Sequence, residues 1–113
     1  MISQVFKTKF PKEYFFNFLD KYCDSKNEQI IFSKEAYKRI KLDNGIEPFC
    51  VNLKNYYFPA KYHYLTREKT YKYFITIIRQ ICKYHHIPFT SKINYSKSKY
   101  EIKYFIYRKS NLP

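Results

Sequence analysis

The sequence predicts an α+β fold that is winged-helix-like, with N-terminal helices and a long helix packed on a C-terminal β-hairpin. Apolar residues recur at helical spacing through most of the first 84 residues, and they alternate with polar residues from about residue 89 onward. The expected order is helix, short strand, helices, long helix, strand, basic loop and strand. This order matches a winged helix-turn-helix except for one extra helix and a connection over 58–66, which is longer than a tight turn.

The first part of the chain predicts three helices and one strand. Phenylalanine, leucine and tyrosine spaced at i, i+3, i+4 and i+7 indicate a helix over 11–23. A β-prone run over 29–32 indicates a short strand, and Ser33 can cap a helix over 34–41. Helical spacing resumes at residue 46 and ends before Pro59.

The last part predicts the longest helix and a hairpin. Thr66 is a suitable N-cap for a helix over 67–84. Two alternating segments then indicate antiparallel strands over 89–95 and 100–107. The turn between them contains no glycine, which favours a four-residue loop over a two-residue one. With 113 residues, the chain is expected to form a single domain, residues 1–113.

The charge of the chain is strongly positive and unevenly distributed. Lys and Arg number 22 against 9 Asp and Glu, a net charge of +13. Residues 1–48 hold 9 basic and 7 acidic residues, whereas residues 49–113 hold 13 basic and 2 acidic residues. Codon bias in an A/T-rich genome would raise lysine throughout, and it is the alternative explanation. Because such bias does not remove acids from one half, the asymmetry favours a surface that meets polyanions.

The predicted long helix has one apolar and one basic side. On a helical wheel its apolar stripe contains Tyr71, Phe74, Ile75, Ile78 and Cys82, flanked by Tyr73, Ile77 and Tyr84. A separate polar arc contains Lys69, Lys72, Thr76, Arg79, Gln80 and Lys83. This arc has four cations and no anion, and its side chains are of types that reach base edges and phosphates. We therefore expect it to bind nucleic acid, with a lysine-rich solvent face as the alternative.

The predicted hairpin adds a second group of cations. Lys92, Lys97, Lys99 and Lys103 cluster near its tip and along its strands, where they would contact phosphates. The alternative is that these lysines protect a sheet edge from pairing with other chains. The 14 tyrosines interleaved with lysines also suggest a stacking surface for single strands, although most of them are expected in the core.

Sequence patterns for catalysis are missing. One glycine in the whole chain excludes a glycine-rich phosphate loop, and no zincin, nucleophile-elbow or paired-acid nuclease motif occurs. Cys82, His85 and His86 form a C-x2-H-H cluster, but the remaining cysteines and His63 are distant in sequence. We expect no enzymatic activity, no cofactor, no metal and three free thiols.

The sequence also lacks patterns for membranes and secretion. No apolar run approaches the roughly 18–20 residues that a membrane span requires, and the N-terminus does not read as a signal peptide. We therefore expect no membrane partner and no secretion.

Four segments of the second half carry a resemblance to a known group. The stretches Arg67–Tyr71, Phe74–Cys82, Thr90–Ile93 and Ser98–Ile102 resemble a block found in uncharacterised small basic proteins of giant DNA viruses of the mimivirus kind. The resemblance covers residues 46–107, and the lysine, isoleucine and tyrosine bias suits such A/T-rich genomes. It implies a viral setting inside an infected host, in a viral factory, the nucleus or the virion, and it implies no activity.

Two functions of different classes follow from these features. The first is a small basic viral nucleic-acid-binding protein, whose helix over 67–84 enters a groove while the hairpin lies on the backbone. Duplex DNA is the favoured partner and RNA the second. The alternative is a viral structural, assembly or host-interaction protein with no nucleic-acid role. A continuous positive stripe would favour the first, and a large exposed apolar patch the second. Sequence specificity and oligomeric state stay open.

Overall fold

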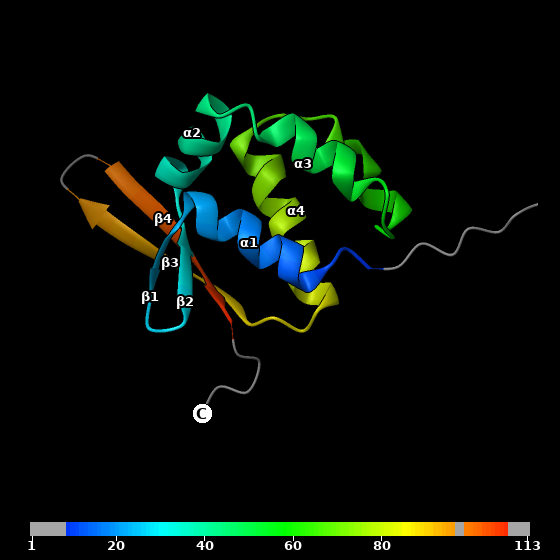
Figure 1. Cartoon of the computed structure of the whole chain (residues 1–113). Helices are drawn as coiled ribbons and strands as arrows, with labels where there is room; N and C mark the ends of the chain where they lie inside the picture. The colour runs from blue at the N-terminus through cyan, green and yellow to red at the C-terminus, as the bar shows by residue number, and fades with distance from the viewer. Residues whose placement is uncertain (1–8, 97–98, 109–113) are drawn as a thin grey trace, which may run out of the picture.

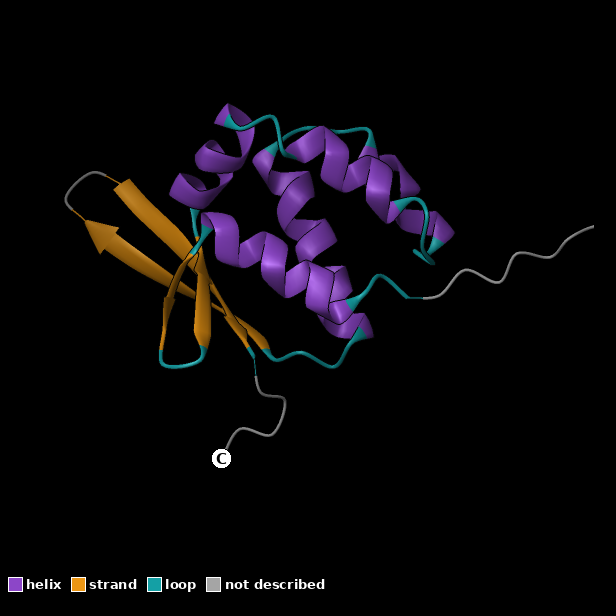
Figure 2. Cartoon of the chain, viewed as in Figure 1, coloured by secondary structure: helices purple, strands orange, loops and turns teal. Residues whose placement is uncertain are grey.

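The chain folds as an α+β structure in which helices gather on one side of a four-stranded antiparallel sheet (Figures 1 and 2). The computed structural model describes residues 9–96 and 99–108. In chain order its elements are α1 (Lys12–Tyr22), β1 (Asp24–Lys26), β2 (Gln29–Phe32), α2 (Lys34–Leu42), α3 (Ile46–Leu53), the 3-10 helix η1 (Ala60–Thr66), α4 (Tyr71–Tyr84), β3 (Phe89–Ser96) and β4 (Lys99–Tyr107).

The sheet joins two strands from the first third of the chain, β1 and β2, to the C-terminal hairpin. Its strand order is β1-β2-β4-β3, and every neighbouring pair is antiparallel. Strand β2 lies beside β4, so that Phe32 is opposite Tyr104 and Ile30 is opposite Ile106. The expected C-terminal hairpin is therefore present, but as half of a larger sheet. Residues 24–26, where the sequence predicts no strand, form the edge strand β1.

The turn between the hairpin strands is shorter than expected. Ser96 is paired with Lys99, so only residues 97–98 connect β3 to β4. These two residues, including Lys97, lie outside the described part of the chain. The expectation of a four-residue loop is thus wrong, because strand pairing continues to the last residue on each side.

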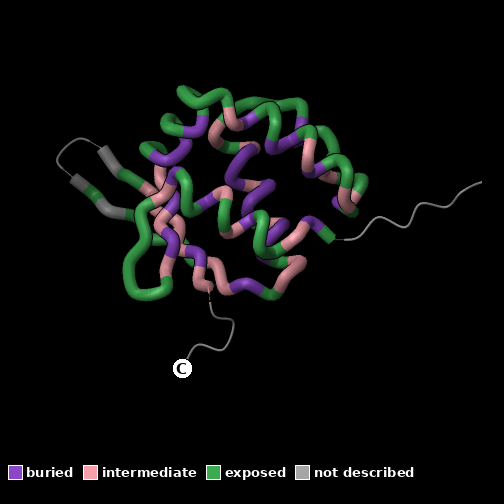
Figure 3. Tube along the Cα trace, viewed as in Figure 1, coloured by how far each residue is buried: buried purple, intermediate pink, exposed green. Residues whose placement is uncertain are grey.

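Buried apolar residues of the helices and of strands β2 and β4 form one cluster within the described ranges, and Figure 3 marks these buried positions along the chain. Phe74 and Ile78 of α4 are 1% and 0% exposed, as their helical stripe predicts. Ile77 and Ile81 are buried as well, so the apolar arc of α4 is wider than the predicted stripe. This wider apolar arc follows from the packing of α4 against both η1 and β3.

The long helix begins four residues later than expected. Residues 60–66 form the 3-10 helix η1, and Thr66 is buried within it rather than capping α4. The Thr66 hydroxyl donates a hydrogen bond to the His63 carbonyl at 2.7 Å. Thr70 is the residue that precedes the first turn of α4. Helix α3 likewise ends at Leu53, before the predicted end.

The turn between α2 and α3 depends on both Asn44 and Gly45. Asn44 takes the left-handed conformation at φ 54°, whereas Gly45 has an ordinary helical φ of −87°. The Gly45 amide donates to the Ile40 carbonyl at 2.8 Å. A Cβ atom at Gly45 would lie 3.0 Å from the Tyr22 hydroxyl oxygen, so glycine allows α1 to approach this turn closely.

The sheet has a covered face and an open one. Alternating residues that include Ile30, Phe32 and Ile106 face the helices and are 0% exposed. We call the opposite side the outer face. From the strand pairing, the outer face consists of Asp24, Lys26, Gln29, Ile31, Thr90, Lys92, Glu101, Lys103, Phe105 and Tyr107. None of these residues is buried.

Candidate nucleic-acid interface

The carboxylates that form ion pairs in the described part of the chain all come from the first 47 residues. The pairs are Asp20–Arg108, Asp24–Arg39 (3.7 Å), Glu35–Lys38 (3.9 Å), Asp43–Lys21 (3.4 Å) and Glu47–Lys69 (3.0 Å). Lys72, Arg79, Lys83, Lys92 and Lys103 form no ion pair with any described residue. Two of the five pairs involve cations of the second half, Lys69 and Arg108, whereas the five cations named above take part in none of them, so the expected interface stays positive.

The C-terminal half of α4 and the start of β3 enclose a basic hollow of about 360 Å³. It is lined by Arg79, Lys83, Ile87, Phe89, Thr90 and Ser91. The lining provides two cations and two hydroxyls and includes no carboxylate. The Arg79 guanidinium lies 5.4 Å from the centre of the Phe89 ring, a cation–π contact that holds it over β3. Such a hollow suits a phosphate group, which accepts hydrogen bonds from both kinds of donor.

A second hollow, of about 350 Å³, lies against the same stretch of α4. It is lined by Lys9, Pro59, Lys61, Tyr62, Gln80, Lys83, Tyr84 and His86, again without a carboxylate. Lys83 lines both hollows, so they form one continuous surface. We call it the α4 basic surface, and its polar residues are Lys9, Lys61, Arg79, Gln80, Lys83, His86, Thr90 and Ser91.

Lys9, Lys61 and His86 were not expected at this interface. They come from three separate segments, and only the packing of those segments against α4 brings them together. The Lys9 ammonium donates to the Tyr84 carbonyl at 3.1 Å and lies 5.5 Å from the centre of the Tyr84 ring. Nothing in the sequence around residue 9 indicates this contact, because its partner is 75 residues away.

The rest of the predicted arc follows α4 toward its N-terminus. Lys72 is exposed, with its ammonium 5.9 Å from the centre of the Tyr73 ring. The Thr76 hydroxyl donates to the Lys72 carbonyl at 3.1 Å within the helix. Helical spacing places both residues on the side of α4 that carries Arg79 and Lys83.

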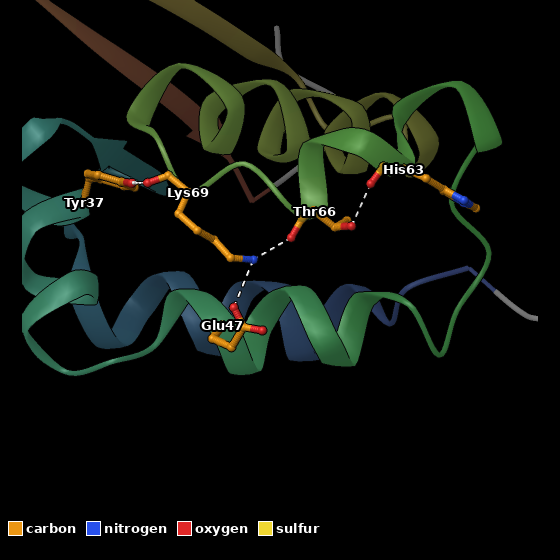
Figure 4. A network of polar contacts seen from close by, with 5 residues as sticks. All are labelled: Tyr37, Glu47, His63, Thr66 and Lys69. Atoms are coloured by element: carbon orange, nitrogen blue, oxygen red, sulfur yellow. Dashed lines mark hydrogen bonds and ion pairs between the residues drawn. The ribbon is translucent and has the colours of Figure 1, made fainter.

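Lys69 has a different place from the one predicted, because it precedes α4 (Figure 4). Its ammonium lies 3.0 Å from the Glu47 carboxylate and donates to the Thr66 carbonyl at 2.5 Å. Its own carbonyl accepts a hydrogen bond from the Tyr37 hydroxyl at 2.5 Å. Lys69 thus ties the segment before α4 to α2 and α3, and it does not belong to the α4 basic surface.

The cations of the hairpin are only partly described. Lys92 and Lys103 lie directly opposite each other on the outer face. Like charges in this arrangement repel each other, which raises the local affinity for an anion. Lys99 is opposite Ser96, and its side chain is not among those described.

The cluster of Cys82, His85 and His86 does not come together as a set of metal ligands. Cys82 is buried, and burial raises the pKa of its thiol to about 12. A ring nitrogen of His85 is within hydrogen-bonding distance of the Phe10 carbonyl, whereas His86 is exposed. Across the described ranges no three His, Cys, Asp or Glu side chains are placed to share a metal ion.

Comparisons with known proteins add no relationship: no family model, curated protein or solved structure matches this chain. Within residues 9–96 and 99–108, no helix has both the length and the apolar character to cross a lipid bilayer.

Proposed function

We propose that the protein binds nucleic acid through the phosphate backbone, using the α4 basic surface. The observation that carries this proposal is the hollow between α4 and β3, where Arg79 and Lys83 lie beside Thr90 and Ser91 with no carboxylate in the lining. A cationic hollow without acids is unusual on a generic solvated surface, because unneutralised like charges repel. Phosphate contacts relieve that repulsion and release counterions.

The form of α4 favours backbone contact over reading of base edges. Recognition helices of the helix-turn-helix type present their N-terminal residues to the major groove. Here Arg79 and Lys83 lie in the second half of α4, against β3, and residues 54–70 separate α4 from α3. The element order still supports the winged-helix interpretation, but the long connection does not supply a tight helix-turn-helix. We therefore expect weak sequence preference.

The test is a salt titration with duplex DNA, single-stranded DNA and RNA of equal length. The wild-type affinity should fall steeply with salt, by roughly a thousandfold between 50 and 200 mM if about six phosphates are neutralised. Combining Lys72→Ala, Arg79→Ala and Lys83→Ala should flatten the log–log slope by about 3, near one unit per lost phosphate contact.

The matched control removes the same charge elsewhere. Lys12, Lys34 and Lys41 are exposed and form no ion pair with described residues. Their triple replacement by Ala should change the slope by much less than the α4 variant. Equal effects from the two sets would reject the α4 basic surface as the binding site.

A second candidate function is an assembly or host-interaction role. Ile93 and Tyr95, near the end of β3, are 46% and 81% exposed, so this part of the hairpin presents apolar surface. That role would leave nucleic-acid binding weak and insensitive to the α4 variant. The viral setting stays a prediction from the resemblance.

A further inference from the structure

The centre of the outer face is aromatic rather than polar. Phe105 and Tyr107 both point away from the helices on β4, the strand flanked by β2 and β3. Ile31 lies directly opposite Phe105 on β2. All three side chains are half-buried and none packs against the core cluster.

This pattern departs from an ordinary half-exposed strand. Antiparallel strands with one solvated face usually alternate apolar and polar residues. In β4, Tyr104 and Ile106 already supply the helix-facing side. Phe105 and Tyr107 are therefore not needed for the core, and they place two rings about 7 Å apart along one strand. Rings in this arrangement offer stacking positions to two successive bases.

Cations and hydroxyls surround these rings. Lys103 is two residues before Phe105 on the same face, and Lys92 is opposite Lys103. Thr90 is opposite Phe105, and it also lines the hollow that contains Arg79 and Lys83. Thr90 thus belongs to both surfaces. A nucleic-acid strand whose phosphates lie in the hollow would therefore cross the edge of β3 and reach the rings of Phe105 and Tyr107.

The acids of the outer face do not interrupt this path. Asp24 is opposite Ile31, on the β1 side, and is ion-paired with Arg39 at 3.7 Å. Glu101 is exposed and precedes Lys103 by two residues, on the side away from Phe105. Thr90, Phe105 and Ile31 lie side by side across β3, β4 and β2, and no carboxylate lies between them.

We propose that the outer face stacks unpaired bases, so that the preferred ligand is a single strand or a looped region. This inference rests on the proposed function and specifies its substrate class. An intact duplex keeps the faces of its bases stacked on one another, whereas a single strand leaves them open to aromatic side chains. The α4 basic surface would then hold phosphates while Phe105 and Tyr107 hold bases.

A fluorescence experiment tests the stacking directly. The chain contains no tryptophan, so Phe105→Trp creates a single reporter on the outer face. Adding an oligothymidine of about ten nucleotides, within the site size of such surfaces, should quench this fluorescence strongly. The matched control is Tyr14→Trp on α1, where Tyr14 is 40% exposed; its fluorescence should stay nearly unchanged.

A second variant tests the contribution to affinity. Leucine at both positions keeps apolar cover over Ile31 and removes the ring faces. Combining Phe105→Leu and Tyr107→Leu should weaken single-strand binding roughly tenfold per ring, with the salt slope and duplex affinity unchanged. The control pair, Tyr14→Leu with Tyr64→Leu, removes two exposed rings elsewhere and should bind as wild type.

The outcomes separate the two proposals. If the wild type shows salt-dependent binding but the Phe105→Trp signal does not respond and the leucine pair binds normally, the stacking inference is wrong and the proposed function stands. If the leucine pair loses duplex and single-strand binding equally, stacking is again rejected. If the wild type binds none of the three nucleic acids, the proposed function fails and the inference fails with it.

Discussion

The helical layer and the outer face of the sheet use the same residue types in opposite ways. In the helical layer, aromatic rings are buried against one another, as where the ring centres of Phe49 and Phe74 lie 5.5 Å apart. Cations there meet carboxylates, as where Lys69 meets Glu47. On the outer face, Phe105 and Tyr107 are only partly buried, and Lys92 lies opposite another lysine. Composition alone therefore cannot separate residues that stabilise the fold from residues that remain available to a ligand.

The largest expected difference between the two regions is in stability. Phe74→Ala should cost about 3–5 kcal/mol of unfolding free energy, because the ring is 1% exposed and its loss leaves a cavity. Phe105→Ala should cost less, about 1 kcal/mol, since its ring is only partly buried and lies on the face of the sheet that the helices do not cover. Urea unfolding of both variants measures the difference. Equal losses would show that Phe105 belongs to the core and would remove the basis for the stacking surface.

A smaller effect concerns the pH dependence of the helical layer. Hydrogen bonds from the Tyr22 hydroxyl and from Lys21 hold the pKa of Asp43 below its ordinary value of 3.8. A lowered folded-state pKa means that Asp43 stabilises the fold above pH 4 and loses this effect as pH falls through its folded pKa. The free energy of unfolding, measured in urea between pH 7 and pH 2, should therefore decrease less in Asp43→Asn than in wild type.

Tyr22→Phe provides the control for that experiment. It keeps the ring and removes the hydroxyl that donates to Asp43 at 2.6 Å. In Tyr22→Phe the unfolding free energy should also fall less steeply at acid pH than in wild type. The change should be smaller than in Asp43→Asn, because Lys21 still donates to the carboxylate. An acid decline in Asp43→Asn as steep as in the wild type would contradict the role of this carboxylate.

The smallest expected effect is on the outer face, where stability and binding should change in opposite directions. Lys92→Glu converts the like-charged pair with Lys103 into an opposite one, which should raise stability by about 0.2–1 kcal/mol at low salt. The same change should weaken nucleic-acid binding, because it places a carboxylate on the path of the phosphates. Lys92→Gln should give a smaller change of each kind. A loss of stability in both variants would contradict this account.

Local patterns were sufficient to predict much of the fold. The strand over 29–32, the helix after Ser33, the stripe of Phe74 and Ile78 and the hairpin strands all depend on neighbouring residues, and the structure confirms them. The strand order was not predictable in this way. Pairing of Phe32 with Tyr104 joins residues 72 positions apart, and no local spacing encodes it.

In the candidate site, too, the residues that share one helix were predictable, whereas those brought together by tertiary packing were not. Arg79, Gln80 and Lys83 could be found from the helical wheel, because they share one side of one helix. Lys69 was placed wrongly, since its contact with Glu47 and the late start of α4 arise from tertiary packing. The aromatic centre of the outer face was also missed, because alternation in β4 does not say which side the helices cover.

The strand order has a consequence for the synthesis of the protein. Strand β2 leaves the ribosome early, but its neighbour β4 is made about 70 residues later, roughly 4–14 s afterward at usual translation rates. Until then Ile30 and Phe32 lack the strand that completes their side of the sheet. Both Thr90 and Phe105 belong to the hairpin of β3 and β4, so we expect neither the hollow between α4 and β3 nor the stacking face to be complete before β4 is made. A chain that stops before β4 should therefore bind nucleic acid more weakly than the full chain, even though all of α4 has been translated.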